Sequence, residues 1–138
     1  MRLLIWHVDS FATEPAERGR SQVADAEPRP VSVREALVVF AAAEAADEAT
    51  PEQVAERTAT AIEDIAGRLG VREIVLHSFA HLFVERLSSP AAAKQILDAT
   101  ERLLRERGYG VEQTAFGWFN RLEMRAKGHP LSRVARQI

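Results

Sequence analysis

The chain has 138 residues, with 18 lysines and arginines against 20 aspartates and glutamates, four histidines and no cysteine. This length suits one domain, and a hydrophobic content of 46% suffices for a core, which excludes a wholly disordered chain. The lack of cysteine excludes disulfide bonds, thiolate metal sites and a cysteine nucleophile. The N-terminal apolar run is too short for a membrane span or a signal sequence.

Charge is distributed unevenly, although the net charge is only −2. Residues 1–70 carry 7 basic and 13 acidic side chains, whereas residues 101–138 carry 8 basic and 4 acidic ones. A basic C-terminal segment can form a local anion-binding face, or it can be an ordinary solvated surface. Charge alone favours the solvated surface.

The first part of the chain predicts two strands separated by a long loop. Residues 2–8 form a nearly continuous apolar run, which is typical of a buried strand. Residues 12–32 contain Pro15, Pro28 and Pro30 among many charges, without periodicity, and predict a loop. The β-branched and aromatic centre of residues 36–44 predicts a strand, although the alanines there also allow a helix.

A helix and a strand are predicted next. Thr50 and Pro51 form a helix start, and Gly70 ends the helix. Its apolar stripe recurs at spacings of three and four and comprises Val54, Thr58, Ala61, Ile62, Ile65 and Leu69. Residues 72–79 then read as a buried strand, so strand, helix and strand predict a right-handed crossover unit.

The last part predicts a second helix, two strands and a tail. The helix begins at Ser88 or Ser89 before a proline and ends at Gly108. Its buried stripe comprises Ala93, Ile96, Leu97, Thr100, Leu103 and Leu104. Residues 111–116 and 118–126 predict two strands that meet near Gly117, and the tail after residue 126 predicts a turn followed by a short helical or irregular segment. This order is typical of a two-layer α/β domain with a mixed sheet.

Most catalytic and metal-binding motifs are absent from the sequence. His7, His77, His81 and His129 lack the spacing of a metal set, and we expect no metal site. The chain contains no GxSxG, P-loop or GxGxxG motif. Asp9, at the end of the first predicted strand, is a lone carboxylate and is better interpreted as a cap or turn residue.

Two short segments place aromatic rings beside small residues. Residues 78–81 (Ser-Phe-Ala-His) follow a buried strand, and residues 116–120 (Phe-Gly-Trp-Phe-Asn) lie between two predicted strands. Such segments can stack a nucleobase and point peptide N–H groups at a developing oxyanion. Aromatic residues at strand ends are more often simply part of the core, so composition alone favours a structural role.

Four stretches, taken together, resemble the N-terminal editing domain of archaeal threonyl-tRNA synthetases. They are residues 1–9 (MRLLIWHVD), 79–82 (FAHL), 101–119 (ERLLRERGYGVEQTAFGWF) and 127–138 (KGHPLSRVARQI). Each stretch is weak alone, but their order over one domain length makes the resemblance specific. It spans residues 1–138 apart from the loop at 12–32, and implies a single editing domain that is part of a longer synthetase chain.

The resemblance implies a fold similar to D-aminoacyl-tRNA deacylases, a mixed sheet with flanking helices, usually paired as a homodimer. It implies hydrolysis of L-serine wrongly attached to tRNA(Thr), in the cytoplasm and without a cofactor. The terminal adenosine and its seryl ester would enter a pocket lined largely by main chain, where the RNA 2′-hydroxyl activates the attacking water. The expected partners are the acceptor end of tRNA(Thr) and the remainder of the synthetase, in cis or in trans, with no membrane.

The same resemblance assigns the site residues. Catalytic positions fall on Ala80, His81 and Asn120. Substrate-binding positions fall on Ala43, Glu44, Ser78, Phe79, Ala93, Phe116, Gly117, Trp118, Phe119 and Arg133. Among these, the backbone of Phe79 and Ala80 would hold the substrate, and the segment at 116–119 would lie near the adenosine.

Three positions depart from the family pattern. Ser78 stands where many members have proline, Asn120 where many have lysine, and Arg133 where a glutamate is often found. Asn120 can still donate a hydrogen bond to a water or a carbonyl, but it brings no charge. If a lysine were the essential group, this chain would be weak or inactive; we favour the RNA hydroxyl in that role, since a main-chain site tolerates side-chain change.

Two other functions remain open at this point. One is a binding module of the same fold that holds the tRNA acceptor end without chemistry. The other is a plain dimerising α/β domain.

Overall fold

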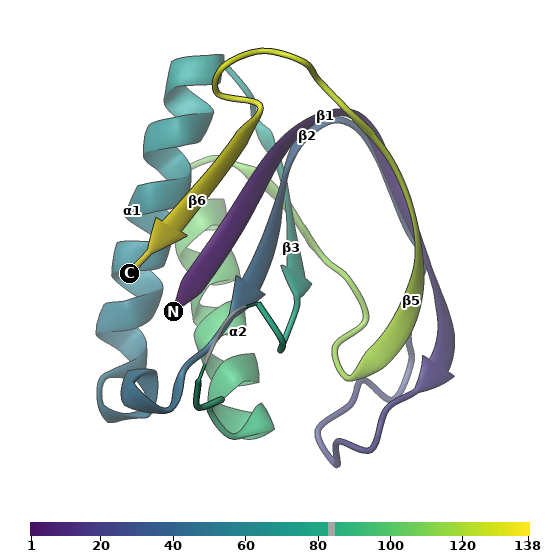
Figure 1. Ribbon diagram of the computed structural model, residues 1–138, viewed down its shortest axis with the longest axis vertical. Coiled ribbons are helices and arrows are strands. Elements are labelled where there is room, and N and C mark those ends of the chain that lie inside the picture. Colours follow the sequence, from purple (N-terminus) through teal and green to yellow (C-terminus); the bar gives the residue numbers. More distant parts are fainter. Residues whose placement is uncertain (83–84) are drawn as a thin grey trace.

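The computed structural model describes residues 1–82 and 85–138, and within them six strands form one mixed sheet with both long helices on one face (Figure 1). The strands are β1 (Arg2–Arg18), β2 (Val31–Ala42), β3 (Glu73–Ser78), β4 (Gly110–Gln113), β5 (Trp118–Ala126) and β6 (Arg133–Gln137). The helices are the 3₁₀ helix η1 (Ala45–Ala49), α1 (Pro51–Leu69) and α2 (Pro90–Glu106).

The strand order is β4-β3-β2-β1-β5, and β6 pairs with β1. Strand β3 is parallel to both β2 and β4, so α1 and α2 each connect two parallel neighbours. Strand β1 is antiparallel to β2, β5 and β6. This arrangement confirms the predicted two-layer α/β class with a mixed sheet.

The main core fills the space between the sheet and the helices. Leu3 and Ile5 of β1 face inward, and the predicted stripes of α1 and α2 supply the opposite wall. Fully buried members of those stripes are Val54, Thr58, Ile62, Ile65, Ile96, Thr100 and Leu104. A smaller apolar cluster, which includes Val8, Phe11 and Val75, covers part of the other face of the sheet.

The helix ends follow the predicted signals in most respects. Gly70 caps α1 with a φ of 68°, the left-handed conformation that glycine adopts without a steric penalty. Ser89 caps α2, and its hydroxyl accepts a hydrogen bond from the Ala92 N–H. Thr50 occupies the N-cap of α1, but its side chain makes no capping hydrogen bond.

The predicted loop at 12–32 is wrong at both ends. β1 continues to Arg18, and β2 begins at Val31, so the connection covers residues 19–30. The long pairing of β1 with β2 and β5 supplies backbone partners that the local sequence does not reveal. Pro15 is tolerated because β2 pairs with β1 only up to Thr13, which leaves one edge of β1 open there.

The predicted strand pair at the end of the chain also needs correction. β4 ends at Gln113, and β4 and β5 lie at opposite edges of the sheet rather than side by side. The tail is not helical or irregular throughout, because β6 pairs with the first residues of β1. This edge is available since β5 pairs only with the later part of β1, from Val8 onward.

The long strands β1 and β2 bend. The second half of β1, the first half of β2 that pairs with it, and β5 therefore lie away from the helices (Figure 1). A break in register at Val8 and Ser10 marks where β1 begins its pairing with β5. β5 is separated from β3 by two strands in the sheet order, yet this bend directs it back toward the end of β3.

Candidate functional site

A cavity of about 380 Å³ lies where the end of β3, the start of β5 and the connection after β1 meet. It brings together the two segments singled out in the sequence. The predicted residues that line it are Ser78, Phe79, Ala80, His81, Gly117, Trp118, Phe119 and Asn120. Further lining residues, which sequence reasoning did not assign to the site, are Gly19, Arg20, Ser21, His77, Ala115 and Leu122.

The wall after β3 combines an exposed ring with unpaired peptide groups. The Phe79 N–H donates to the Ala41 carbonyl, 2.9 Å away, which fixes the start of this segment against β2. The Phe79 side chain is 43% exposed, and its ring lies edge-on to Phe40. Within the described residues, the N–H groups of Ala80 and His81 have no hydrogen-bond partner. No described residue therefore competes with an anionic or carbonyl oxygen for these two donors.

The opposite wall is a turn that depends on two glycines. Gly117 has a φ of 75°, and a Cβ there would lie 2.6 Å from the Ala24 Cβ. The Gly19 N–H donates to the Gly117 carbonyl at 2.8 Å, and a Cβ on Gly19 would lie 2.7 Å from that oxygen. Glycine at both positions thus allows the connection after β1 to approach the turn closely.

Asp25 clamps the same turn from the connection after β1. Its backbone N–H donates to the Phe116 carbonyl, and its Oδ2 accepts from the Phe116 N–H at 2.7 Å. Its carbonyl accepts a hydrogen bond from the Trp118 indole at 2.8 Å. Lys94 of α2 lies 3.5 Å from the Asp25 carboxylate. No local pattern in the sequence predicts this clamp, because its partners are about 90 residues apart along the chain.

Asn120 lines the cavity and has a side-chain oxygen without a partner among the described residues. Its Nδ2 donates to the Trp118 carbonyl at 3.0 Å, which orients the amide. Its Oδ1 is buried and has no hydrogen-bond partner among the described residues. A buried amide oxygen without a partner carries a desolvation cost that a bound donor would relieve.

His77 is the buried titratable group of the cavity. Its Nδ1 lies 2.8 Å from the Thr114 hydroxyl, and its ring packs edge-on against Phe40 with 5.0 Å between centroids. Burial lowers the pKa of His77 to about 4, so the imidazole is neutral at neutral pH. The period-two pattern of β3 places His77 with Val75 on the face opposite the helices, which was the available sequence signal.

The remaining predicted site residues lie outside this cavity. Ala43 is buried in the helix-side core, and Ala93 packs against the same core. Phe116 is buried below the turn, with the Lys94 ammonium 5.6 Å from its ring centroid. Arg133 extends over the ring of Trp6, which joins β6 to β1.

Glu44 belongs to an ion-pair cluster at the chain start. Its carboxylate accepts from the N-terminal ammonium at 2.8 Å and from Arg2 at 3.0 Å. Burial alone raises the pKa of Glu44, but these hydrogen bonds outweigh burial and hold the pKa below its usual value. These contacts hold Glu44 against the start of β1, away from the residues that line the cavity.

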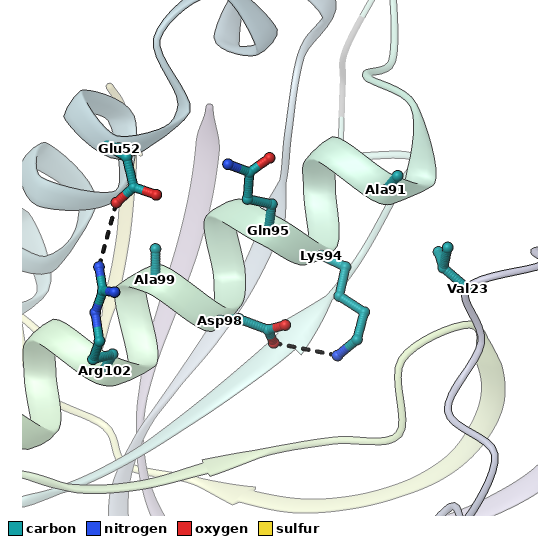
Figure 2. Close-up of a pocket in the computed structure, with 8 residues that line it drawn as sticks. All are labelled: Val23, Glu52, Ala91, Lys94, Gln95, Asp98, Ala99 and Arg102. Atoms are coloured by element: carbon teal, nitrogen blue, oxygen red, sulfur yellow. Dashed lines mark hydrogen bonds and ion pairs between the residues drawn. The ribbon is translucent and has the colours of Figure 1, made fainter.

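Figure 2 shows a second depression, of about 570 Å³, between the outer side of α2 and Val23. Its cations already have partners. Lys94 lies 3.2 Å from Asp98, and Arg102 lies 3.3 Å from Glu52. No predicted site residue lines this depression, so it is not the candidate site.

The described residues also bear on metal binding and on membrane insertion. Residues 1–82 and 85–138 contain no group of three or more His, Asp or Glu side chains placed to hold a metal ion. In the same part of the chain, no helix has the length and apolar character needed to cross a membrane.

Comparisons with known proteins place the chain in a family. The model of the archaea-specific editing domain of threonyl-tRNA synthetase matches residues 1–138. The chain is 42% identical over 140 residues to the threonine–tRNA ligase of Methanopyrus kandleri and 37% identical over 138 residues to that of Methanocaldococcus jannaschii. All of this chain is covered in each case, and it spans 22% of the length of each relative.

A solved structure of a c-Myc DNA unwinding element binding protein is similar in fold. The TM-score is 0.71 at 12% identity, covering 100% of this chain and 99% of the other. At that identity the similarity concerns the fold alone, and it confirms the predicted fold class. The family match adds a role in proofreading of tRNA charging: this chain belongs to the archaea-specific editing-domain family of threonyl-tRNA synthetases.

Proposed function

We propose that this chain hydrolyses the ester of L-serine wrongly attached to tRNA(Thr), which releases serine and intact tRNA. The observation that carries the proposal is the cavity that joins residues 78–81 to residues 117–120 in a member of an editing-domain family. We propose that it acts as a single domain in the cytoplasm, as a homodimer, together with the rest of a synthetase in cis or in trans.

The unpaired peptide groups suit the chemistry of ester cleavage. Water attacks the carbonyl carbon, a tetrahedral oxyanion forms, and the 3′-oxygen of the terminal adenosine leaves and takes up a proton. The N–H groups of Ala80 and His81 are available to bind the oxyanion. A preorganised donor of this kind typically contributes about 10²–10³ in rate.

We assign activation of the water to the RNA. The 2′-hydroxyl next to the scissile ester is positioned by the substrate itself, so no protein base is needed. Asn120 lines the cavity, and we assign to its Oδ1, which has no partner among the described residues, acceptance of a hydrogen bond from the water or the substrate amine in the bound complex. His81 and Asn120 therefore position the reacting groups in this scheme.

Aromatic side chains provide the surface for the terminal adenosine. Phe79 and Phe119 are 43% and 66% exposed, and both line the cavity. Exposed rings stack nucleobases, at about 1–3 kcal/mol per base. Trp118 is fixed by its indole hydrogen bond to Asp25, so this side of the surface is rigid.

Selectivity for serine requires exclusion of threonine, which is larger by one methyl group. Favourable contacts alone distinguish two substrates that differ by one methyl group by only about 1–3 kcal/mol of binding free energy. A sieve that clashes with the larger group can exceed this. We assign the sieve to Phe79 and the main chain at Ala80; Ala43, buried in the core, does not line the cavity.

The test is release of labelled serine from seryl-tRNA(Thr), with threonyl-tRNA(Thr) as the matched control. We expect serine release well above the rate without protein, and little release of threonine. Binding of the acceptor end without release would contradict hydrolysis and identify a binding module. Absence of both binding and release would leave only a structural α/β domain.

A further inference from the structure

His77 lines the cavity, but the proposed reaction assigns no role to its imidazole ring. His77 is 7% exposed and lies in β3, beside the segment that begins at Ser78. Phe40 packs against the imidazole edge-on, so the ring cannot rotate freely. Its one hydrogen bond to a described residue joins Nδ1 to Thr114, which leaves Nε2 as the remaining polar atom of a residue that lines the cavity.

The hydrogen bond between Thr114 and His77 determines which ring nitrogen of His77 carries the proton. The Thr114 side chain is buried, and its hydroxyl has no other hydrogen-bond partner among the described residues. A buried hydroxyl that failed to donate its proton would carry a desolvation cost. The hydroxyl therefore donates to Nδ1, and the single ring proton of the neutral imidazole resides on Nε2.

We propose that His77 is a further substrate-contacting residue, whose Nε2–H donates a hydrogen bond to an oxygen of the aminoacyl ester held in this cavity. Thr114 is then a positioning residue that keeps the proton on Nε2. A neutral donor fixed by packing before the ester arrives needs no reorganisation during the reaction. The inference rests on the proposed function, since it takes the same cavity as the place of ester binding.

Two amide substitutions separate the two nitrogens of the ring. In His77→Asn the short amide replaces Nδ1 and keeps the Thr114 bond, but nothing reaches the Nε2 position. In His77→Gln the longer amide reaches the Nε2 position and gives up the Thr114 bond. We expect His77→Asn to lower kcat for seryl-tRNA(Thr) by about 10²-fold, the effect of losing one oxyanion donor, while His77→Gln recovers most of the rate.

A purely structural role predicts the opposite order. In that case His77→Asn, which keeps the internal hydrogen bond, is the better tolerated variant in both kcat and thermal unfolding. An unchanged kcat in folded His77→Asn, or equal loss in both folded variants, would overturn the proposal.

Nitrogen NMR of the four histidine rings provides a readout that needs no variant. We expect the unsubstituted chain to show the Nε2–H tautomer at His77, and its Nε2 signal to shift when a non-hydrolysable seryl-adenosine amide binds. An Nδ1–H tautomer would contradict the proposal. An unchanged His77 Nε2 signal, together with a shift of the Ala80 amide signal on ligand binding, would also contradict the proposal. The proposed function would survive that result. If no cavity signal responds and no serine is released, the proposed function fails and this inference fails with it.

Discussion

Asn120 lines the cavity at the position where the resemblance to the family implies a lysine in many members, and it brings hydrogen-bonding atoms without a charge. Its Nδ2 is engaged by the Trp118 carbonyl, whereas the buried Oδ1 has no hydrogen-bond partner among the described residues. An amide held in this way orients a water or an amine but does not take up a proton.

Asn120→Ala should therefore slow serine release modestly, by less than the roughly 10²–10⁴-fold that general acid–base groups contribute. Single-turnover deacylation of seryl-tRNA(Thr) measures this effect, with Asn120→Lys as the comparison that restores the family residue. Complete loss of activity in Asn120→Ala would show that the side chain is catalytic, and a large gain in Asn120→Lys would show that lysine supplies the missing chemistry.

His77 also links the cavity to acid stability. Burial lowers the pKa of His77 to about 4 in the folded chain, from the ordinary histidine value of 6.5, so the unfolded chain binds more protons between these values. The free energy of unfolding is unaffected by His77 titration above pH 6.5. It decreases by about 3 kcal/mol as the pH falls from 6.5 to 4, because only the unfolded chain binds the proton in this range.

Urea unfolding at pH 7.5 and at pH 4 tests the His77 contribution. The free energy of unfolding should fall by about 3 kcal/mol more in the unsubstituted chain than in His77→Gln, which does not titrate. Equal losses in the two proteins would show that His77 is protonated as easily when folded as when unfolded.

At the scale of elements, the parts that local signals determine were predictable and the parts that need distant partners were not. Gly70 and Ser89 mark helix ends through their own backbone or side chain, so α1 and α2 were found. The extension of β1 beyond residue 8 depends on its pairing with β2 and β5, and β6 depends on its pairing with Arg2–Trp6. No local pattern predicts either pairing.

The turn before β5 is the element on which the site depends most. Gly117→Ala would place a Cβ 2.6 Å from the Ala24 Cβ and strain a φ of 75°. We expect a loss of about 1–3 kcal/mol in stability and a fall of at least about tenfold in serine release, because the turn lines the cavity.

Gly67→Ala is the matched control, since nothing lies within 4 Å of the added Cβ and the site is in α1. It should leave activity unchanged and be neutral to slightly stabilising. Thermal unfolding and serine release on both variants measure the difference. Equal behaviour of the two would contradict the role assigned to the Gly117 turn.

At the scale of the whole molecule, the bend of β1 and β2 creates the site. It brings the start of β5 to the end of β3, although two strands separate them in the sheet order (Figure 1). The aromatic and small residues drew attention to both segments that line the cavity, but composition alone favoured a structural role, and the family resemblance assigned them to a site. It did not predict the Asp25 clamp or the His77–Thr114 pair, because each joins residues that only the folded chain places together.

In the proposed reaction, peptide groups position the ester and the RNA itself activates the water. The decisive measurement is serine release from seryl-tRNA(Thr) ending in 2′-deoxyadenosine, with binding of the same tRNA measured in parallel. We predict that cleavage is abolished while affinity is nearly unchanged. Cleavage of the deoxy substrate at a rate close to that of the ribose substrate would show that a protein side chain activates the water.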